Sequence, residues 1–465
     1  KHVIHHVDIK SAYLYTPLSV EIFMEIPRGM TDIPKGKCLK LHKCLYGLKQ
    51  AGREFNIRLD KHLILYLKCE KCSADHCVYR AQVSGFTVFL LIWVDDMLIS
   101  AINDATAIKV KNILRKYFEL TDLGKLEYYL GMRITYDANG DIHVDQAKYV
   151  TDMLTRFNML DCKTVHIPIP ARTKFCKKGI FNTKNRAPLV PFSEILPVQN
   201  DRDTKIDEYR LNIDFGEKKI PPDPKMSGIP YRELIGSLMF LACNTRPDIQ
   251  CTVICLSKYM SNPMHTHWIY AKRILRFLKL TREDKLTFRF KNSRTDVTAY
   301  VDSSHNSDPD SSAALAGYVI SINSTPVIWR SGFARHKSLS STESEYAALS
   351  EIAKKICWFN KIFRFFLERI TFSPNSRQNT VPATPIIRVD NQGSIKLAEN
   401  PVFHSRTGHI YPRYHFTRQC LKLNEFTIEY CDTNENPADI FTKALPKIKF
   451  YKFRNIFLNS NVSPN

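Results

Sequence analysis

The sequence lacks any apolar run that approaches the ~20 residues a transmembrane helix needs. It opens on Lys1 without the charged and apolar stretches of a signal peptide. Its thirteen cysteines are scattered without the even pattern of a disulfide framework, so we interpret them as reduced thiols. No internal repeat of about 20–50 residues is visible. We therefore expect a protein that is neither secreted nor embedded in a membrane.

Acidic residues are also in short supply. The chain has 46 Asp and Glu against 67 Lys and Arg, which gives a formal net charge of +21. Such an excess of positive charge favours a polyanionic partner such as nucleic acid, although it also fits a basic protein that its charge keeps soluble. Hydrophobic residues make up 44% of the chain, which is enough for a sizeable core. The length of 465 residues suggests about three domains.

The pattern along the chain predicts a mixed α/β (α+β) protein. Strand-like and helix-like segments alternate over residues 1–165, and prolines with charges replace this periodicity over 166–226, which we expect to be a linker. A helical connection is expected over 227–292, another mixed segment over 293–450, and a tail over 451–465.

The most apolar run ends in two adjacent acids. Eight of the nine residues from Phe86 to Val94 are large and apolar, and Asp95 and Asp96 follow directly. A hairpin turn at this point would remove both carboxylates from the core, and Asp tolerates turn geometry. The strand-like segment VIHHVDI reaches another acid, Asp8. An ordinary Asp-containing turn explains the pair alone, whereas a strand-end Asp beside it makes an Mg²⁺ site possible.

Four motifs occur in an order that is specific to one family. HVDIKSAYLY, CLYGLKQAGREF, WVDDMLIS and ELTDLGKLEYYLGMRI together resemble the reverse transcriptase of copia-type LTR retrotransposon polyproteins. WVDD resembles that family's YVDD box, with Trp93 in place of Tyr. The resemblance continues through YRELIGSLMFLACNTRPDI and HWIYAKRILRFLKLT to the end of the chain, apart from the linker.

The resemblance implies roles for individual residues. Asp8 and Asp95 would hold two catalytic Mg²⁺ ions, with Asp96 beside them. Tyr13 would select deoxynucleotides by excluding a ribose 2′-OH, although a plain core tyrosine fits the same position. Gly47 and Lys49 would lie in the loop beneath the incoming nucleotide, where glycine permits close backbone approach; a glycine at a helix start is the structural alternative. The implied fold is a polymerase palm and thumb, with the fingers missing because only seven residues precede Asp8.

A second group of acids lies in the mixed segment 293–450. VTAYVDSS and IIRVDNQG end strands at Asp302 and Asp390, while STESEYAALSEIAKKICWF and NENPADIFTKAL begin helices near Glu345 and Asp439. Taken singly, the helix-start acids fit a capping box or a favourable helix dipole. The order of all four resembles RNase H, whose mixed five-stranded sheet with flanking helices would place them around two Mg²⁺ ions.

This second segment departs from the family pattern at three places. The family's VDSDWAGD reads VDSSHNSD here, so Ser304-His305 replaces Asp-Trp. Pro412 falls inside an expected helix, which it would kink. No histidine occurs in residues 431–438, before the last acid. His265 and His267, by contrast, are interpreted as packing groups at a helix start.

Two functions follow from these observations. The resemblance implies an RNA-directed DNA polymerase with RNase H activity, using an RNA template, a DNA primer, an RNA–DNA hybrid and deoxynucleoside triphosphates. It also implies a place in the DNA integration pathway and a location in the cytoplasm, including particles, and in the nucleus. The departures and the missing fingers favour the alternative, a decayed or domesticated nucleic-acid-binding fragment without catalysis, and make polymerisation the weaker expectation.

Overall fold

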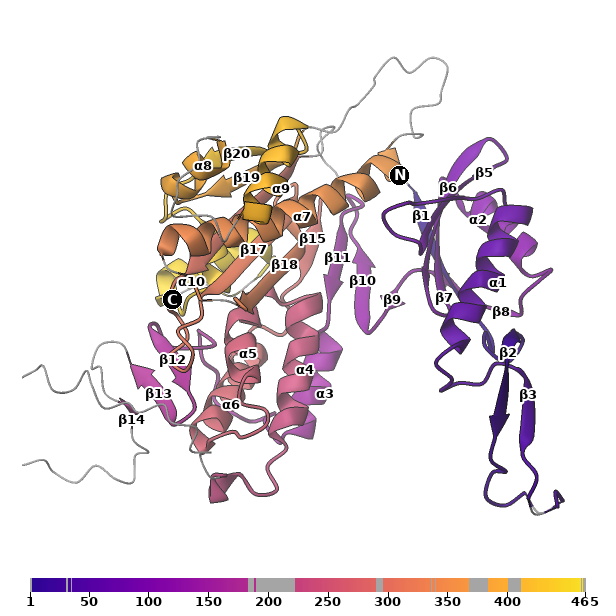
Figure 1. Cartoon of the computed structure of the whole chain (residues 1–465), viewed down its shortest axis with the longest axis horizontal. Helices are drawn as coiled ribbons and strands as arrows, with labels where there is room; N and C mark the ends of the chain where they lie inside the picture. Colours follow the sequence, from indigo (N-terminus) through magenta and orange to yellow (C-terminus); the bar gives the residue numbers. More distant parts are fainter. Residues whose placement is uncertain are drawn as a thin grey trace, which may run out of the picture. The chain divides into compact units, whose positions relative to one another are not determined.

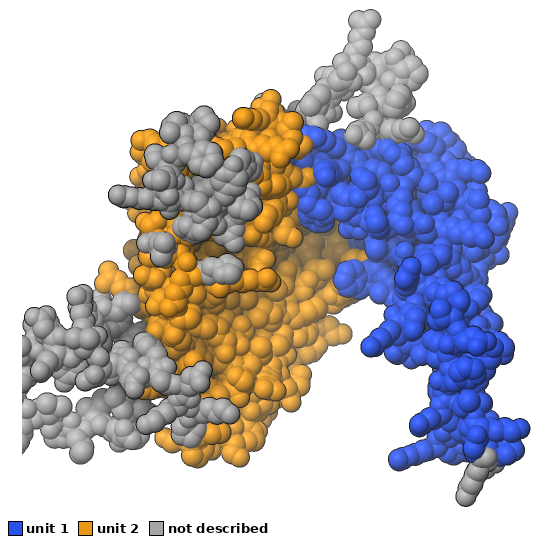
Figure 2. Space-filling model, viewed as in Figure 1, with its two compact units in different colours: residues 1–127, 358–381 blue, residues 128–357, 382–465 orange. Residues whose placement is uncertain are grey.

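The computed structural model describes residues 2–30, 32–34, 36–182, 188–189, 222–289, 296–335, 337–338, 340–367, 384–399, 411–460 and 462. The chain forms two compact units (Figure 2). Unit 1 comprises residues 1–127 and 358–381, and unit 2 comprises residues 128–357 and 382–465. Within the described residues, no helix combines the length and apolar character that crossing a membrane requires.

The helices are labelled in Figure 1. Those of the first half are α1 (Ala51–Tyr66), α2 (Asp104–Leu114), α3 (Ala147–Arg156), α4 (Tyr231–Asn244), α5 (Gln250–Ser257) and α6 (His265–Leu280). Those of the second half are α7 (Ser341–Leu367), α8 (Gln392–Glu399), α9 (Tyr411–Lys422) and α10 (Lys447–Phe457). Short 3-10 helices include η2 (Pro224–Met226), η3 (Pro247–Ile249) and η5 (Pro437–Phe441).

The main sheet of unit 1 has six antiparallel strands among the described residues. Their order is β4 (Glu70–Lys71), β5 (Val78–Val83), β6 (Phe86–Trp93), β7 (Asp96–Ala101), β1 (Val3–Ile9) and β8 (Leu120–Lys125). A separate hairpin joins β2 (Pro17–Met24) to β3 (Leu39–Lys43). Helices α1 and α2 bury their apolar residues against one face of the main sheet, which explains the apolar run of β6.

The side chains of strand β1 alternate between a face that packs in the core and a face that carries Asp8. Val7 and Ile9 belong to the core that α1 and α2 cover. Since neighbouring strand residues point to opposite faces, Asp8 lies on the other side, away from the helices. His5, which shares the side of Val7, contacts Asp104 and Lys111 of α2 at 2.7 Å and 2.8 Å.

Unit 2 contains a mixed sheet that confirms the predicted five strands with flanking helices. Over the described residues its order is β18 (Thr325–Phe333), β17 (Leu315–Ile322), β16 (Val297–Ser304), β19 (Ile386–Val389) and β20 (Thr427–Tyr430). Strands β16 to β18 are antiparallel, whereas β19 runs parallel to both β16 and β20. The core of this unit joins residues from α3 to α6, η5 and α10.

Two smaller sheets complete unit 2 in the described part of the chain. One has the order β15 (Leu286–Phe288), β11 (Ile142–Asp145), β10 (Met132–Tyr136) and β9 (Tyr128–Tyr129). The other has the order β12 (Thr173–Cys176), β13 (Gly179–Asn182) and β14 (Pro188–Leu189).

The compact units do not follow the expected boundary at residue 165. Strand β11 pairs with β15, so residues 128–165 fold with the second half of the chain. The expected linker, 166–226, carries the hairpin of β12 and β13 in its described part; residues 183–187 and 190–221 lie outside the described residues.

The expected tail begins inside helix α10. Its Tyr451, Phe453 and Phe457 are buried in the core of unit 2. Arg454 of the same helix is fully buried, and its Nε lies 3.1 Å from a carboxylate oxygen of Asp248. This part of the expected tail therefore belongs to the fold of unit 2. The lysines and arginines of α10 obscure its amphipathic pattern in the sequence.

Pro412 lies in the first turn of α9 as the structure describes this helix. Helix α9 begins at Tyr411, so the proline is its second residue. The amide of a residue in the first turn has no partner within the helix, and the fixed φ of proline suits this position. The expected kink is therefore absent from α9, since the helix starts where the proline permits it.

Candidate active sites

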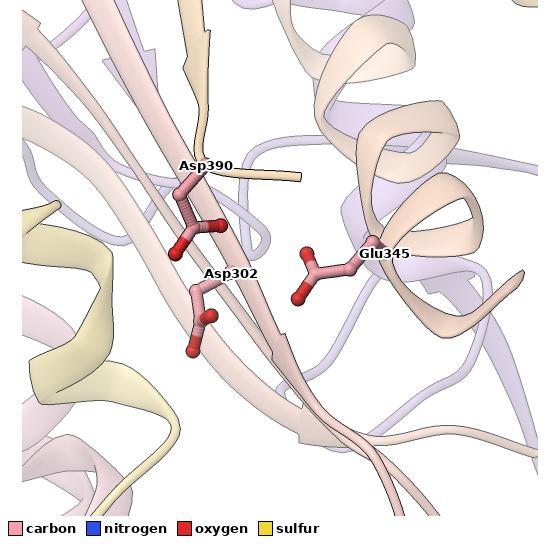
Figure 3. A group of neighbouring side chains, drawn as sticks. All are labelled: Asp302, Glu345 and Asp390. Carbon is pink, nitrogen blue, oxygen red and sulfur yellow. The ribbon is translucent and has the colours of Figure 1, made fainter. Parts of the chain in front are cut away.

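Three of the four acids expected in the second segment come together. Asp302 lies on β16, Glu345 lies on α7, and Asp390 follows β19. One potential ligand atom from each lies within 4.8 Å of the others. Figure 3 shows Glu345 on its helix facing the two aspartates, which project from neighbouring strands. Among the described residues this is the single group of carboxylate, imidazole or thiol ligands with such spacing.

The register of the sheet brings the two aspartates to the same level. Tyr300 of β16 is paired with Arg388 of β19, and the two strands run parallel. Asp302 and Asp390 each follow two residues later, so both reach the same edge of the sheet on the same side. The first-turn amide of Glu343 donates to Ser340 Oγ at 3.1 Å, which places Glu345 in the helix and leaves its side chain free to face the strands.

The electrostatics of this acidic triad, Asp302, Glu345 and Asp390, favour a cation. Glu345 is 6% exposed; burial, followed by repulsion from Asp302 and Asp390, raises its pKa to about 9. Burial also raises the pKa of Asp302 to about 6, with Asp439 and Asp390 adding to it. The Glu345 Oε2 atom is buried without a hydrogen-bond partner. Oxygen ligands, crowded negative charge and an unpaired carboxylate oxygen fit a hard divalent cation such as Mg²⁺.

Asp439, the fourth predicted acid, is held by lysines instead. It lies in η5, where Asn436 caps the first turn by accepting from Ala438 N at 3.1 Å. Asp439 is 1% exposed and is 2.6 Å from Lys443 Nζ and 2.7 Å from Lys449 Nζ. It is not part of the group whose ligand atoms lie within 4.8 Å. The structure therefore groups three of the four predicted acids, and Lys443, which the sequence pattern did not indicate, lies between Asp439 and Asp302.

The acids of unit 1 lie at and beside the tip of a hairpin, as the WVDD pattern predicts, but the described structure does not bring three of their ligand atoms within 4.8 Å of one another. Trp93 of β6 pairs with Asp96 of β7, which leaves Val94 and Asp95 as the two-residue loop. Asp8 of β1 stands directly opposite Asp96 across the neighbouring ladder. Val94 has a φ of +58°, which is strained for a β-branched residue and is a feature that gathers at functional sites.

The surroundings of Asp8 also make its charged carboxylate unfavourable unless a cation compensates it. Burial, followed by repulsion from Asp95 and Asp96, raises the pKa of Asp8 above its ordinary value. His6 Nε2 lies 2.8 Å from an oxygen of Asp96, a contact that the sequence reasoning missed. The two-residue alternation of a β-strand could have indicated this contact, because His6 and Asp8 lie on the same face.

Of the residues expected at the nucleotide, Tyr13 lies beside Tyr46, and burial followed by the nearby charge of Asp95 raises the pKa of Tyr46. The Tyr13 ring lies 4.8 Å from the Tyr46 ring and 5.9 Å from the Phe55 ring, measured between centroids. Gly47 has a φ of +97°, so it needs glycine for its turn rather than for a helix start. Lys49 is exposed two residues before α1. Tyr46 was not predicted; its place beside Gly47 in the CLYGLKQ motif is the signal that could have found it.

The comparisons with known proteins first give a family match for part of the chain. Residues 1–171 match the family described as reverse transcriptase (RNA-dependent DNA polymerase). A solved structure, that of the foamy viral protease–reverse transcriptase in complex with dsDNA, aligns with 93% of this chain and 68% of that chain, at 10% identity and a TM-score of 0.41.

The relatives then confirm the predicted resemblance to copia-type Pol polyproteins. The chain is 32% identical over 454 residues to the retrovirus-related Pol polyprotein from transposon TNT 1-94 of Nicotiana tabacum, covering 96% of this chain and 30% of that protein. It is 29% identical over 465 residues to the polyprotein from transposon RE1 of Arabidopsis thaliana, covering 99% of this chain and 28% of that protein. The chain thus spans less than a third of the length of these relatives, and its residues 1–171 match the reverse transcriptase family.

Proposed function

We propose that this chain is the polymerase and RNase H segment of a retrotransposon Pol polyprotein. Unit 1 copies an RNA template from a DNA primer with deoxynucleoside triphosphates, and the mixed sheet of unit 2 cleaves the RNA of an RNA–DNA hybrid. The observation that carries the nuclease assignment is the triad of Asp302, Glu345 and Asp390, whose ligand atoms lie within 4.8 Å of one another.

The nuclease proposal rests on what these side chains can do. Asp302 and Asp390 would hold a divalent cation at the edge of the sheet, and Glu345 would complete its ligands. Divalent cations held there, two in the full site, supply charge neutralisation at the reacting phosphate and activation of water. The excess of basic residues over acidic ones, 67 against 46, favours approach of the polyanionic hybrid.

The polymerase proposal rests on the family match and on the hairpin loop. Asp8 and Asp95 would hold the cations that bind the triphosphate and activate the primer end, with Asp96 oriented by His6. Tyr13 would limit the space beside the sugar of the incoming nucleotide. The 2.9 Å hydrogen bond from Ile9 N to Asp95 O fixes the loop against the strand that bears Asp8.

The nuclease half is tested with a labelled RNA–DNA hybrid, Mg²⁺ and the Asp390→Asn variant. We expect Mg²⁺-dependent cleavage of the RNA strand by the chain and a loss of roughly a hundredfold or more in the variant, because one ligand charge disappears. A matched variant, Asp432→Asn, removes an exposed acid close to the last strand and should cleave normally. Cleavage without Mg²⁺, or full activity of Asp390→Asn, would overturn the assignment.

The polymerase half is tested by primer extension on an RNA template. Extension that disappears in Asp95→Asn supports it. Specific binding of a primed template without extension or cleavage would instead favour the non-catalytic alternative, to which the Ser304-His305 replacement points.

A further inference from the structure

A lysine lies between two of the acids of the nuclease site. The Lys443 Nζ atom is 3.2 Å from Asp302 Oδ1 and 2.6 Å from Asp439 Oδ1. Both aspartates are 1% exposed, whereas the Lys443 side chain keeps 36% of its surface in contact with solvent. The lysine therefore reaches from the surface into the acidic site with only its ammonium group between the carboxylates.

The ammonium group compensates the charge that these carboxylates would otherwise leave buried. Burial alone would lower the pKa of Lys443, but attraction to Asp302 and Asp439 outweighs it and raises the pKa above its ordinary value. Lys443 is consequently a permanent cation at neutral pH. A buried carboxylate without such compensation is destabilising, so the lysine stabilises the arrangement of Asp302 and Asp439.

At Glu345, burial and repulsion from Asp302 and Asp390 outweigh the attraction to Lys443 and raise the pKa. Glu345 Oε2 has no hydrogen-bond partner, and the ligand atoms of Asp302, Glu345 and Asp390 already lie within 4.8 Å of one another. Asp302 thus belongs to the acidic triad and also accepts from Lys443 through Oδ1 and from Thr442 through Oδ2.

We propose that the Lys443 ammonium occupies the position of a second cation between Asp302 and Asp439. On this view the triad accepts one divalent cation directly, and a further divalent cation between Asp302 and Asp439 binds only when Lys443 withdraws toward solvent. Lys443 is then a positioning residue that sets how many cations the site holds. This inference rests on the proposed nuclease function of the same site.

Lys449 and the helix geometry make such a withdrawal feasible. Lys449 Nζ remains 2.7 Å from the other carboxylate oxygen of Asp439, so this acid keeps one partner when Lys443 leaves. Lys443 is four residues after Asp439, and the solvent-exposed part of its flexible side chain can carry the ammonium group outward. Asp302 keeps its hydrogen bond from Thr442 Oγ1.

The test is Mn²⁺ binding measured by calorimetry and electron paramagnetic resonance. The chain carries Asp8→Asn and Asp95→Asn, so that the acids of unit 1 contribute little. We expect one Mn²⁺ ion to bind by way of the triad and a second ion to bind weakly. In Lys443→Met the second ion should bind at least about tenfold more tightly, because a cation beside two carboxylates has been removed.

Two matched variants separate the charge of Lys443 from its packing. Lys443→Arg keeps a cation and should retain the weak second site. Lys452→Met removes a surface lysine of α10 that contacts Glu435 and the carbonyl of Asn434 and lies over the Phe453 ring, and it should bind as the parent does. Lys443→Gln serves where Lys443→Met does not fold, as judged by circular dichroism.

The outcomes are distinct. Equal or weaker binding of the second ion in both Lys443→Met and Lys443→Gln would overturn the inference and leave the proposed function standing. Mn²⁺ binding that is unaffected by Asp390→Asn would overturn the metal site itself, and with it both proposals.

Discussion

Gly317 of β17 lies directly beneath the short helix that carries Asp439. A Cβ atom built on this glycine would be 2.5 Å from the Cβ of Phe441 and 2.8 Å from Cγ2 of Thr442. Thr442 in turn donates a hydrogen bond to Asp302. The absence of a side chain at one position of the sheet therefore allows η5 to approach the nuclease acids.

Gly317→Ala should destabilise unit 2. The added methyl group meets backbone-anchored atoms that have little freedom to move, so we expect a loss of about 1–3 kcal/mol in the free energy of unfolding. The matched control is Gly236→Ala in α4, where a Cβ atom has no neighbour within 4 Å. That change should stabilise the helix by about 0.5–1 kcal/mol. Urea unfolding measures both, and an unchanged midpoint for Gly317→Ala would contradict this packing of η5 on β17.

Lys111→Met should destabilise unit 1. Lys111 is 2% exposed and contacts His5 at 2.8 Å and Asp122, so its loss leaves the buried His5 ring without one partner, while the exposed Asp122 keeps Arg115 at 3.0 Å. A cost of about 1–3 kcal/mol is typical when a buried polar group loses its partner. Lys109, on the same helix, is exposed and contacts Ser84. Lys109→Met should stay within about 0.5 kcal/mol of the parent in chemical unfolding.

His267 should make the protein sensitive to acid. This side chain is fully buried, accepts from Met264 N at 3.0 Å through Nδ1, and lies 3.1 Å from Cys176 O through Nε2. Burial lowers its pKa from 6.5 to about 4. The unfolded chain therefore binds more protons between these values, and the stability that neutral His267 contributes is lost as pH falls through this window, by roughly 3 kcal/mol.

His267→Gln provides the comparison for this pH dependence. Glutamine does not titrate, so the variant should be less stable at pH 7 but should lose less stability between pH 6.5 and 4 than the parent. Thermal unfolding monitored by circular dichroism at several pH values tests this. Parallel curves for the two proteins would show that other groups cause the acid sensitivity.

Tyr13→Ala should weaken the selection against ribonucleotides if unit 1 extends primers. The Tyr13 ring is positioned by Tyr46 and Phe55, so its removal opens space beside the sugar of an incoming nucleotide rather than changing charge. We expect incorporation of ribonucleotides relative to deoxynucleotides to rise roughly tenfold to a hundredfold. Tyr13→Phe keeps the ring and should retain selection, and competitive incorporation assays compare the three proteins. Equal selectivity in all three would place the selection elsewhere.

The sequence by itself determined the local features of both sites. An apolar run interrupted by Asp95 and Asp96 forms a hairpin because a buried strand cannot hold two uncompensated carboxylates. Alternation along β1 places Asp8 on the face opposite Val7, whatever the neighbouring strands are. Local hydrophobic periodicity indicated a mixed segment of strands and helices over 293–450, and the resemblance to RNase H implied its five-stranded sheet.

Only the tertiary structure decided which residues meet. The parallel pairing of β16 with β19 brings Asp302 beside Asp390, and Lys443, four residues after Asp439, bridges Asp439 to Asp302. The pairing of β11 with β15 likewise moves residues 128–165 into unit 2. These outcomes depend on contacts between segments far apart in the chain, where hydrogen bonding and burial select one pairing among many that the local patterns allow.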